Sequence, residues 1–206
     1  MIRILCALAL LAVAQPTYAD TIGVTTAGGY TVLTFFDTVI GWSFTANTDV
    51  QVGALGMWDE GGDGFVEDVN VGLWTDSGTL LGLATVGSTD GLDAGFRFAA
   101  IPPILLTGGN SYTVAGLLRA PDYYRAFTQV TNSPLITWSD SRAVNTNVLT
   151  FPTEITGREG SYFGANLRVT PVAPIPEPAS LVLLGLGLAG IGARRWYYQK
   201  CEVSAR

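Results

Sequence analysis

Hydrophobic and polar positions alternate in short runs between Asp20 and about Thr170. The runs are rich in β-branched and aromatic residues and are separated by Gly, Asp, Asn and Pro, which is the pattern of strands joined by turns. Turn signals such as Asp76-Ser77-Gly78 and Thr89-Asp90-Gly91 stand between the runs. The predicted strands are residues 30–36, 40–44, 50–58, 69–74, 80–86, 96–99, 111–118 and 167–169.

This region contains no convincing apolar repeat of 3.6 residues with helix caps. Short strands at such regular spacing predict an all-β fold, an antiparallel β-sandwich with a jelly-roll-like arrangement. Residues 121–163 are less regular, and we expect long loops there with one or two further strands. The sequence therefore predicts one β-sandwich outer domain over residues 20–170.

The N-terminus has the features of a secretory signal. Arg3 is followed by an apolar stretch over residues 4–14, which is too short to span a bilayer. Pro16 breaks the helix, and Thr17-Tyr18-Ala19 places small residues at the two positions that a signal peptidase recognises. Residues 1–19 are therefore predicted to be a helical signal peptide that signal peptidase removes after Ala19.

The C-terminus combines several features in a fixed order. A proline-rich spacer, residues 171–175, leads into Pro176-Glu177-Pro178 and an uncharged, glycine-rich run over residues 179–193. The basic pair Arg194-Arg195 follows, and a basic tail occupies residues 199–206. Residues 176–198 are predicted to be a sorting and anchoring segment with a single transmembrane helix. Arg194 and Arg195 form its cytoplasmic basic stop, and the N-terminal domain lies outside the membrane.

This arrangement closely resembles the PEP-CTERM sorting signal of Gram-negative bacteria. The resemblance covers about residues 174–198 and rests on the order of Pro176-Glu177-Pro178, the glycine-rich helix and the arginines. It implies recognition by an exosortase, a membrane-embedded transpeptidase that cuts near the motif, and a link to exopolysaccharide and biofilm formation. The expected location is the cell envelope, at the outer surface or in the extracellular matrix, after initial anchoring in the inner membrane. The tail at residues 199–206, which includes Cys201, departs from the usual short arginine-rich ending.

A second resemblance concerns the domain itself. Gly41-Trp42-Ser43-Phe44, Gly56-Met57-Trp58-Asp59 and Val71-Gly72-Leu73-Trp74 form a recurring pattern. With the later segment Leu105-Leu106-Thr107-Gly108-Gly109, it is similar to a group of uncharacterised secreted bacterial β-sandwich domains. The resemblance implies a fold and transfers no catalytic residue.

Charge and composition exclude several kinds of function. Residues 20–175 contain six arginines, no lysine and fifteen acidic residues, a net charge of −9 that disfavours nucleic acid as a partner. The chain has no histidine, and its two cysteines, Cys6 and Cys201, lie in the terminal segments. Ser-His-Asp and Cys-His catalysis, Schiff-base chemistry and the usual zinc sites are therefore excluded for the domain.

An acidic segment over residues 59–68 is the sharpest candidate for a metal site. Calcium binds six to eight hard oxygen ligands, which carboxylates and loop carbonyls supply. The segment does not match an EF-hand loop, because Gly61 and Asn70 stand at two of the ligand positions. Two interpretations stay open: a calcium site of another kind and a solvated acidic hairpin between strands. The candidate calcium ligands are Asp59, Glu60, Asp63, Glu67 and Asp68.

Aromatic residues suggest a second kind of site. Sugar-binding sandwiches stack a pyranose ring on Trp or Tyr, and Tyr123, Tyr124 and Trp138 are the candidate carbohydrate contacts. A structural role is the alternative for these three residues. Three other tryptophans lie in strand patterns and are predicted to be core: Trp42, Trp58 and Trp74.

These features together predict a non-enzymatic, exported interaction protein that is processed by an exosortase and associated with exopolysaccharide. The alternative is a secreted carbohydrate-active enzyme, because a pair of carboxylates is sufficient for glycoside hydrolysis and needs no histidine. No particular pair of carboxylates is marked by the sequence.

Overall fold

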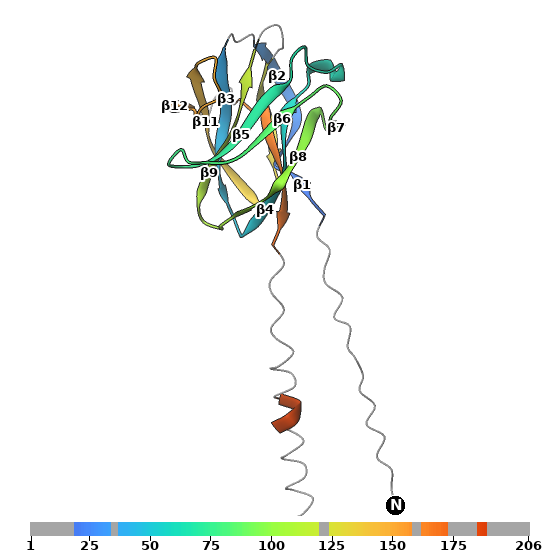
Figure 1. Ribbon diagram of the computed structural model, residues 1–206, viewed down its shortest axis with the longest axis vertical. Coiled ribbons are helices and arrows are strands. Elements are labelled where there is room, and N and C mark those ends of the chain that lie inside the picture. Colours follow the sequence, from blue (N-terminus) through green and yellow to red (C-terminus); the bar gives the residue numbers. More distant parts are fainter. Residues whose placement is uncertain (1–18, 34–36, 120–123, 158–161, 173–184, 189–206) are drawn as a thin grey trace, which may run out of the picture. The chain divides into compact units, whose positions relative to one another are not determined.

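The computed structural model describes residues 19–33, 37–119, 124–157, 162–172 and 185–188 (Figure 1). The chain divides into two compact units, Met1–Val172 and Ala173–Arg206. The first unit contains all the strands, and the described part of the second is one helical turn at residues 185–188.

One antiparallel sheet has five strands. Their order in the sheet is β1 (Thr21–Ile22), β13 (Ala165–Pro171), β4 (Val50–Trp58), β8 (Phe96–Leu106) and β7 (Gly91–Asp93). The first and last strands of the chain, β1 and β13, therefore lie side by side in this sheet.

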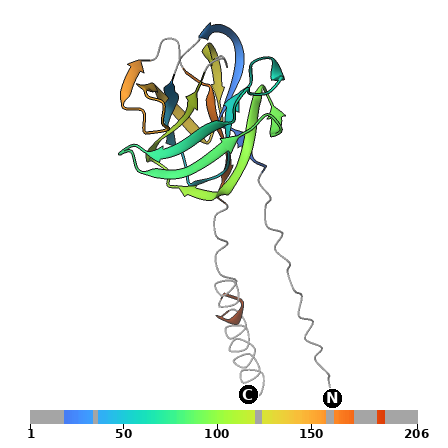
Figure 2. The same cartoon turned by 45° about the horizontal axis from the view of Figure 1, so that its top comes forward.

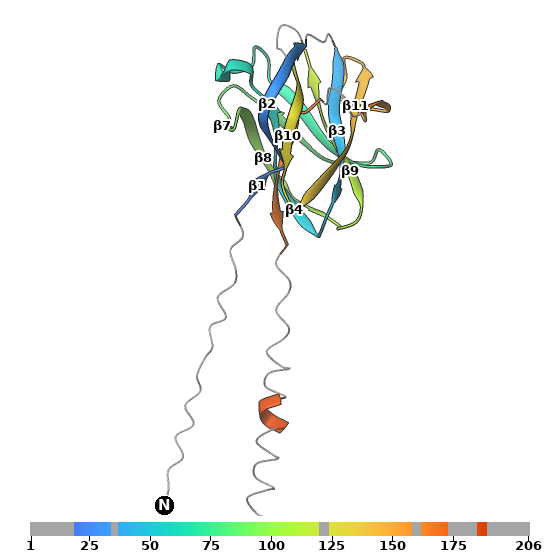
Figure 3. The same cartoon turned by 180° about the vertical axis from the view of Figure 1, so that it is seen from behind.

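A second antiparallel sheet has six strands. Their order is β12 (Glu154–Gly157), β11 (Ile136–Asn145), β3 (Thr38–Ala46), β9 (Ser111–Leu118), β5 (Val69–Thr75) and β6 (Leu80–Val86). A separate antiparallel pair joins β2 (Val24–Leu33) to β10 (Tyr124–Asn132), as Figure 3 shows from behind.

The tilted view in Figure 2 shows the strands of the two large sheets around the middle of the domain. The buried side chains of the main core come from both sheets. Strand alternation explains its composition, because every second residue of β3 and β5 points inward. Trp42 on β3 is fully buried, and its indole Nε1 donates a hydrogen bond of 2.6 Å to the carbonyl oxygen of Ala165 on β13. This bond links the sheets directly, and the rings of Phe44 and Phe163 lie 5.3 and 5.7 Å from the Trp42 ring.

A smaller apolar cluster covers the outer face of the six-stranded sheet. Trp74 on β5 packs there with Val39, Ala115 and Leu117, and the chain after β11 contributes Phe151. The Trp74 and Phe151 rings meet edge-on with their centroids 6.3 Å apart. The segment between β11 and β12 therefore acts as a cover for part of this face.

The predicted all-β class is confirmed, with antiparallel sheets consistent with a β-sandwich. The chain crosses between the two large sheets from β3 to β4, β4 to β5, β6 to β7, β8 to β9 and β12 to β13, whereas the β5–β6, β7–β8 and β11–β12 pairs each stay in one sheet. Residues 121–163, where we expected long loops with one or two strands, contain β10, β11 and β12.

Most of the predicted terminal helices lie outside the described residues. The predicted signal peptide, residues 1–19, is described only at its last residue. Of the anchoring segment only residues 185–188 are described, and they are helical. Within the described ranges, no helix has the length and apolar character needed to cross a membrane.

Candidate functional site

The acidic segment begins where β4 ends. Asp59 follows Trp58, and the short 3-10 helix η1 (Glu60–Gly62) comes next. Gly61, Gly62 and Gly64 all have positive φ angles, of 84°, 74° and 99°, which glycine adopts without the steric cost of a Cβ atom. The glycines let the chain reverse sharply here, and this reversal turns the first carboxylate inward.

Asp59 is buried and forms an ion pair. Its side chain is 1% exposed, and its Oδ2 atom accepts a hydrogen bond of 2.6 Å from Nε of Arg97 on β8. The backbone N–H of Gly64 donates to both carboxylate oxygens, at 3.2 and 3.0 Å. The carboxylate of Asp59 is therefore occupied by donors from the protein itself.

Arg97 extends this network to two loops. Its Nη1 atom donates to the carbonyl oxygen of Asp90 at 2.9 Å, and its Nη2 atom donates to the carbonyl oxygen of Gly62 at 3.0 Å. With the bond to Asp59, one guanidinium joins the η1 turn to the turn before β7. A buried charge needs such a complete set of partners, so the arrangement holds the loops in place.

The other four acidic residues of the segment do not converge. Glu60 accepts a hydrogen bond of 3.1 Å from the indole of Trp58, and Glu67 forms an exposed pair with Arg119 at 3.5 Å. Asp63 and Asp68 are exposed. Among the described residues, no three acidic, cysteine or histidine side chains are gathered in a way that could hold a metal ion.

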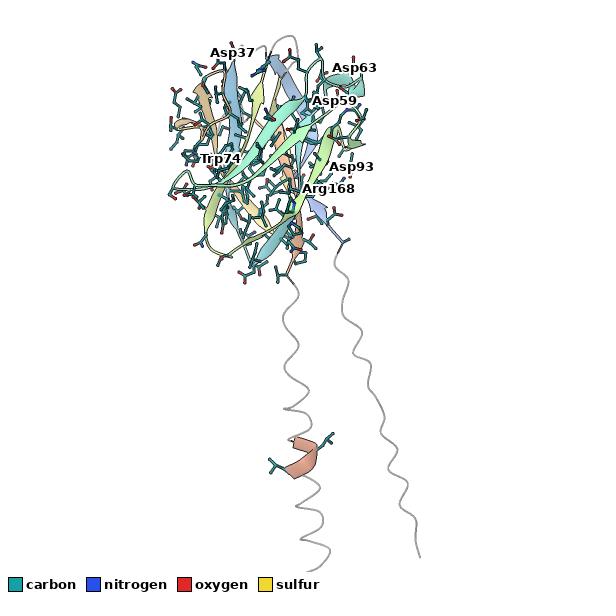
Figure 4. The ribbon with its side chains drawn as sticks, in the orientation of Figure 1. Asp37, Asp59, Asp63, Trp74, Asp93 and Arg168 are labelled. Carbon is teal, nitrogen blue, oxygen red and sulfur yellow. The ribbon has the colours of Figure 1, made fainter. Side chains whose placement is uncertain are left out.

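Figure 4 labels Asp59 and Asp63 near one end of the domain and Trp74 at a separate place. Calcium at the acidic segment stays a prediction that these contacts do not support, because the buried Asp59 already has its partners. The alternative interpretation, a solvated hairpin, describes the exposed Asp63, Glu67 and Asp68 but not the buried Asp59.

The three candidate carbohydrate contacts are not brought together by the described residues. Tyr123 lies outside them, and Tyr124 is the first residue of β10, with a side chain that is not described. Trp138 is half-buried and packs against the main core, with its ring 5.4 Å from that of Phe163. Their role as sugar contacts stays a prediction.

The predicted core tryptophans differ from one another. Trp42 and Trp74 are buried, as their strand positions indicate, at 0% and 4% exposure. Trp58 is half-buried and packs edge-on against Phe96 at 5.0 Å. Trp42 belongs to the main core between the sheets and Trp58 packs against that core, whereas Trp74 belongs to the outer cluster.

A groove of about 320 Å³ lies beside Trp74 on the outer face of the six-stranded sheet. Strands β5, β6 and β9 form its base, and residues 147–149 form one wall. Sequence reasoning did not predict this groove. The outward positions of β5, Asn70 and Gly72, could have indicated it, because a glycine beside a tryptophan on one face leaves room for the indole to lie flat.

The comparisons with known proteins identify the C-terminal segment. Residues 174–195 match the PEP-CTERM protein-sorting motif. No curated protein and no solved structure matches the chain. The motif residues Pro176, Glu177 and Pro178 and the basic pair Arg194 and Arg195 lie outside the described residues.

The sorting motif marks a protein for export, with a membrane-anchored precursor in the cell envelope and processing by an exosortase. The matched residues cover the Pro-Glu-Pro motif, the glycine-rich run and the basic pair, so the PEP-CTERM resemblance seen in the sequence is confirmed. The chain carries a PEP-CTERM protein-sorting motif and is, on that ground, an exported protein targeted to an exosortase.

Proposed function

We propose that the outer domain is a non-enzymatic interaction module that associates with exopolysaccharide at the cell surface or in the extracellular matrix. The observation that supports the proposal is the sorting motif at residues 174–195, because it marks the chain for export and exosortase processing in the cell envelope, and the PEP-CTERM resemblance links such proteins to exopolysaccharide. Export, processing and release would then place the β-sandwich among glycan chains.

The side chains of the domain support a binding role. Residues 20–175 contain no histidine, lysine or cysteine, so histidine general bases, lysine Schiff bases and cysteine nucleophiles are missing from them. The buried acidic residue Asp59 is held by Arg97 and by the Gly64 N–H, and its side chain is only 1% exposed, which leaves it out of reach of a ligand. A domain of this kind can bind without turning over what it binds.

The alternative is a secreted glycosidase that uses two carboxylates. Incubating the full chain with a panel of purified polysaccharides distinguishes the two functions. We expect polysaccharide beads to retain the protein while the assay for reducing ends stays at the level of a buffer control. Release of reducing ends would contradict the binding function, and absence of both retention and release would contradict the association with polysaccharide altogether.

A further inference from the structure

We propose that the groove on the outer face of the six-stranded sheet binds a neutral pyranose unit of a glycan chain. The choice of a glycan rests on the proposed function, and the position and chemistry of the site rest on the groove itself. Its volume of about 320 Å³ is at the lower end of the range for ligand sites and suits one or two sugar rings.

The floor of the groove is apolar and is shaped by a glycine. A Cβ atom at Gly72 would lie 2.3 Å from the Cη2 atom of Trp74, so the indole lies across Gly72 on the outer face of β5. Leu117 on β9 borders the same cluster. Trp74 and Leu117 are only 4% and 5% exposed, so they support the groove from below, and the C–H face of a pyranose ring would pack mainly against the exposed apolar side chains of the walls.

Exposed apolar side chains line the open side of the groove. Leu83 on β6 is 52% exposed, and Val148 on the opposite wall is 65% exposed. Both line the groove, which is open rather than enclosed, so a chain of linked rings could enter and leave at the rim. Exposed apolar side chains grouped around a concave site are typical of a ligand surface.

The rim supplies hydrogen-bond donors. The Oδ1 atom of Asn70 accepts a bond of 2.9 Å from Thr85, and within the described part of the chain its Nδ2 group has no protein partner. Arg119 is 50% exposed and contacts Glu67 at 3.5 Å and the Asn147 carbonyl oxygen at 3.3 Å. An exposed pair of this length contributes little, so the guanidinium can turn to a ligand at small cost.

These features together favour a sugar over the other ligands that fit an open groove. A fatty chain would use the apolar walls but would make no use of the amide and guanidinium donors at the rim. A polyanionic glycan would be repelled by a domain whose residues 20–175 carry a net charge of −9. A neutral pyranose offers hydroxyl acceptors on its edge and an apolar face.

The test uses the full chain in lipid nanodiscs and three neutral probes: cellohexaose, laminarihexaose and mannohexaose. Affinity is measured by calorimetric titration for the wild type and for Leu83→Trp, which fills the groove from its exposed wall. Leu105→Trp is the matched control, because Leu105 is 63% exposed on β8 of the other sheet. We expect at least one probe to bind, with a loss of affinity of about tenfold or more in Leu83→Trp and no change in Leu105→Trp.

A second variant tests the donor role without filling the groove. Asn70→Asp keeps an oxygen to accept the Thr85 bond but removes the Nδ2 donor, and we expect about a three- to tenfold loss of affinity, the effect of one hydrogen bond. Equal binding by Leu83→Trp and the wild type would overturn the groove assignment while leaving the proposed function intact. The choice of a sugar would be overturned if the wild type bound laurate more tightly than any hexasaccharide and Leu83→Trp no longer bound it. Failure of the wild-type chain to bind any probe or any polysaccharide bead would contradict the proposed function itself.

Discussion

Trp42 and Trp74 lie in similar strand patterns of the sequence, but their side chains lie on opposite faces of the same six-stranded sheet. Each lies in a hydrophobic strand and each is almost fully buried, at 0% and 4% exposure. Trp42 points between the sheets and bonds to Ala165 at 2.6 Å, whereas Trp74 points outward and is covered by Phe151 and its neighbours.

Burial alone therefore does not separate a core residue from a residue that shapes a surface. The inner tryptophan joins the two sheets, so its loss affects the whole sandwich. The outer tryptophan belongs to a small cluster and lies over Gly72 beside an open groove. We expect the inner face to determine stability and the outer face to determine binding.

The largest expected effect is that of Trp42→Ala. Removing a fully buried indole and its bond to Ala165 should lower the free energy of unfolding by about 4 kcal/mol. Trp74→Ala should lower the free energy of unfolding by less, about 2 kcal/mol, because its cluster is small and borders solvent, so the site can collapse more easily than the main core. Urea unfolding of the two variants measures both values, and equal losses would contradict the distinction between the faces.

The buried ion pair ranks next. Arg97→Met leaves the carboxylate of Asp59 buried without its charged partner, and this should cost about 3 kcal/mol. The exposed pair of Glu67 and Arg119 is the matched control, and Glu67→Gln should cost less than about 1 kcal/mol. Thermal unfolding of the two variants measures both losses. If the double variant Asp59→Ala, Arg97→Met lost as much free energy of unfolding as the two single variants added together, the residues would not act as a pair.

Alanine substitutions at two glycines of the six-stranded sheet test how firmly the neighbours of each glycine are held in place. A Cβ atom at Gly41 would lie 1.9 Å from the carbonyl oxygen of Val114, so Gly41→Ala forces β3 and β9 apart. At Gly72 the added atom meets the ring of Trp74, which can tilt toward the groove. We expect a loss of about 3 kcal/mol for Gly41→Ala and about 1 kcal/mol for Gly72→Ala, measured by chemical unfolding. A larger loss at Gly72 would show that the outer indole is as firmly fixed as the backbone of β9.

The smallest expected effect is that of calcium. Because Asp59 is already paired with Arg97, we expect the melting temperature to stay unchanged from micromolar to millimolar calcium. The opposite result would be a melting temperature that calcium raises in the wild type but not in the double variant Asp59→Ala, Asp63→Ala, with each protein compared with and without calcium. That result would support the calcium site predicted from the sequence.

Strands with a clear inside and outside could be predicted from the sequence. The predicted ranges 50–58, 80–86 and 111–118 coincide with β4, β6 and β9. The strands β10 and β11 could not be placed, because residues 121–163 show no regular alternation of apolar and polar positions. Each of the two strands contains a register shift, between Gln129 and Val130 and between Trp138 and Asp140, but β4 contains one as well and was predicted, so the shift alone is not the reason.

The candidate site was less predictable for a related reason. Asp59 and Arg97 are 38 residues apart, and they meet because Met57 pairs with Arg97 in the register of β4 and β8. The pattern of residues within either strand does not reveal how β4 and β8 are aligned with each other. The acidic segment was recognisable from its composition, but the partner that turns Asp59 from a candidate metal ligand into half of an ion pair was not.

The central claim is that the sorting segment delivers the outer domain to an exosortase. Intact mass and cell fractionation of the full chain, expressed with and without an exosortase, test it most directly. We predict loss of the segment beyond Pro178 only in the host that contains the enzyme, with the domain released from the membrane fraction. An uncut C-terminus in both hosts would contradict the account, because the domain would then have no route into the matrix.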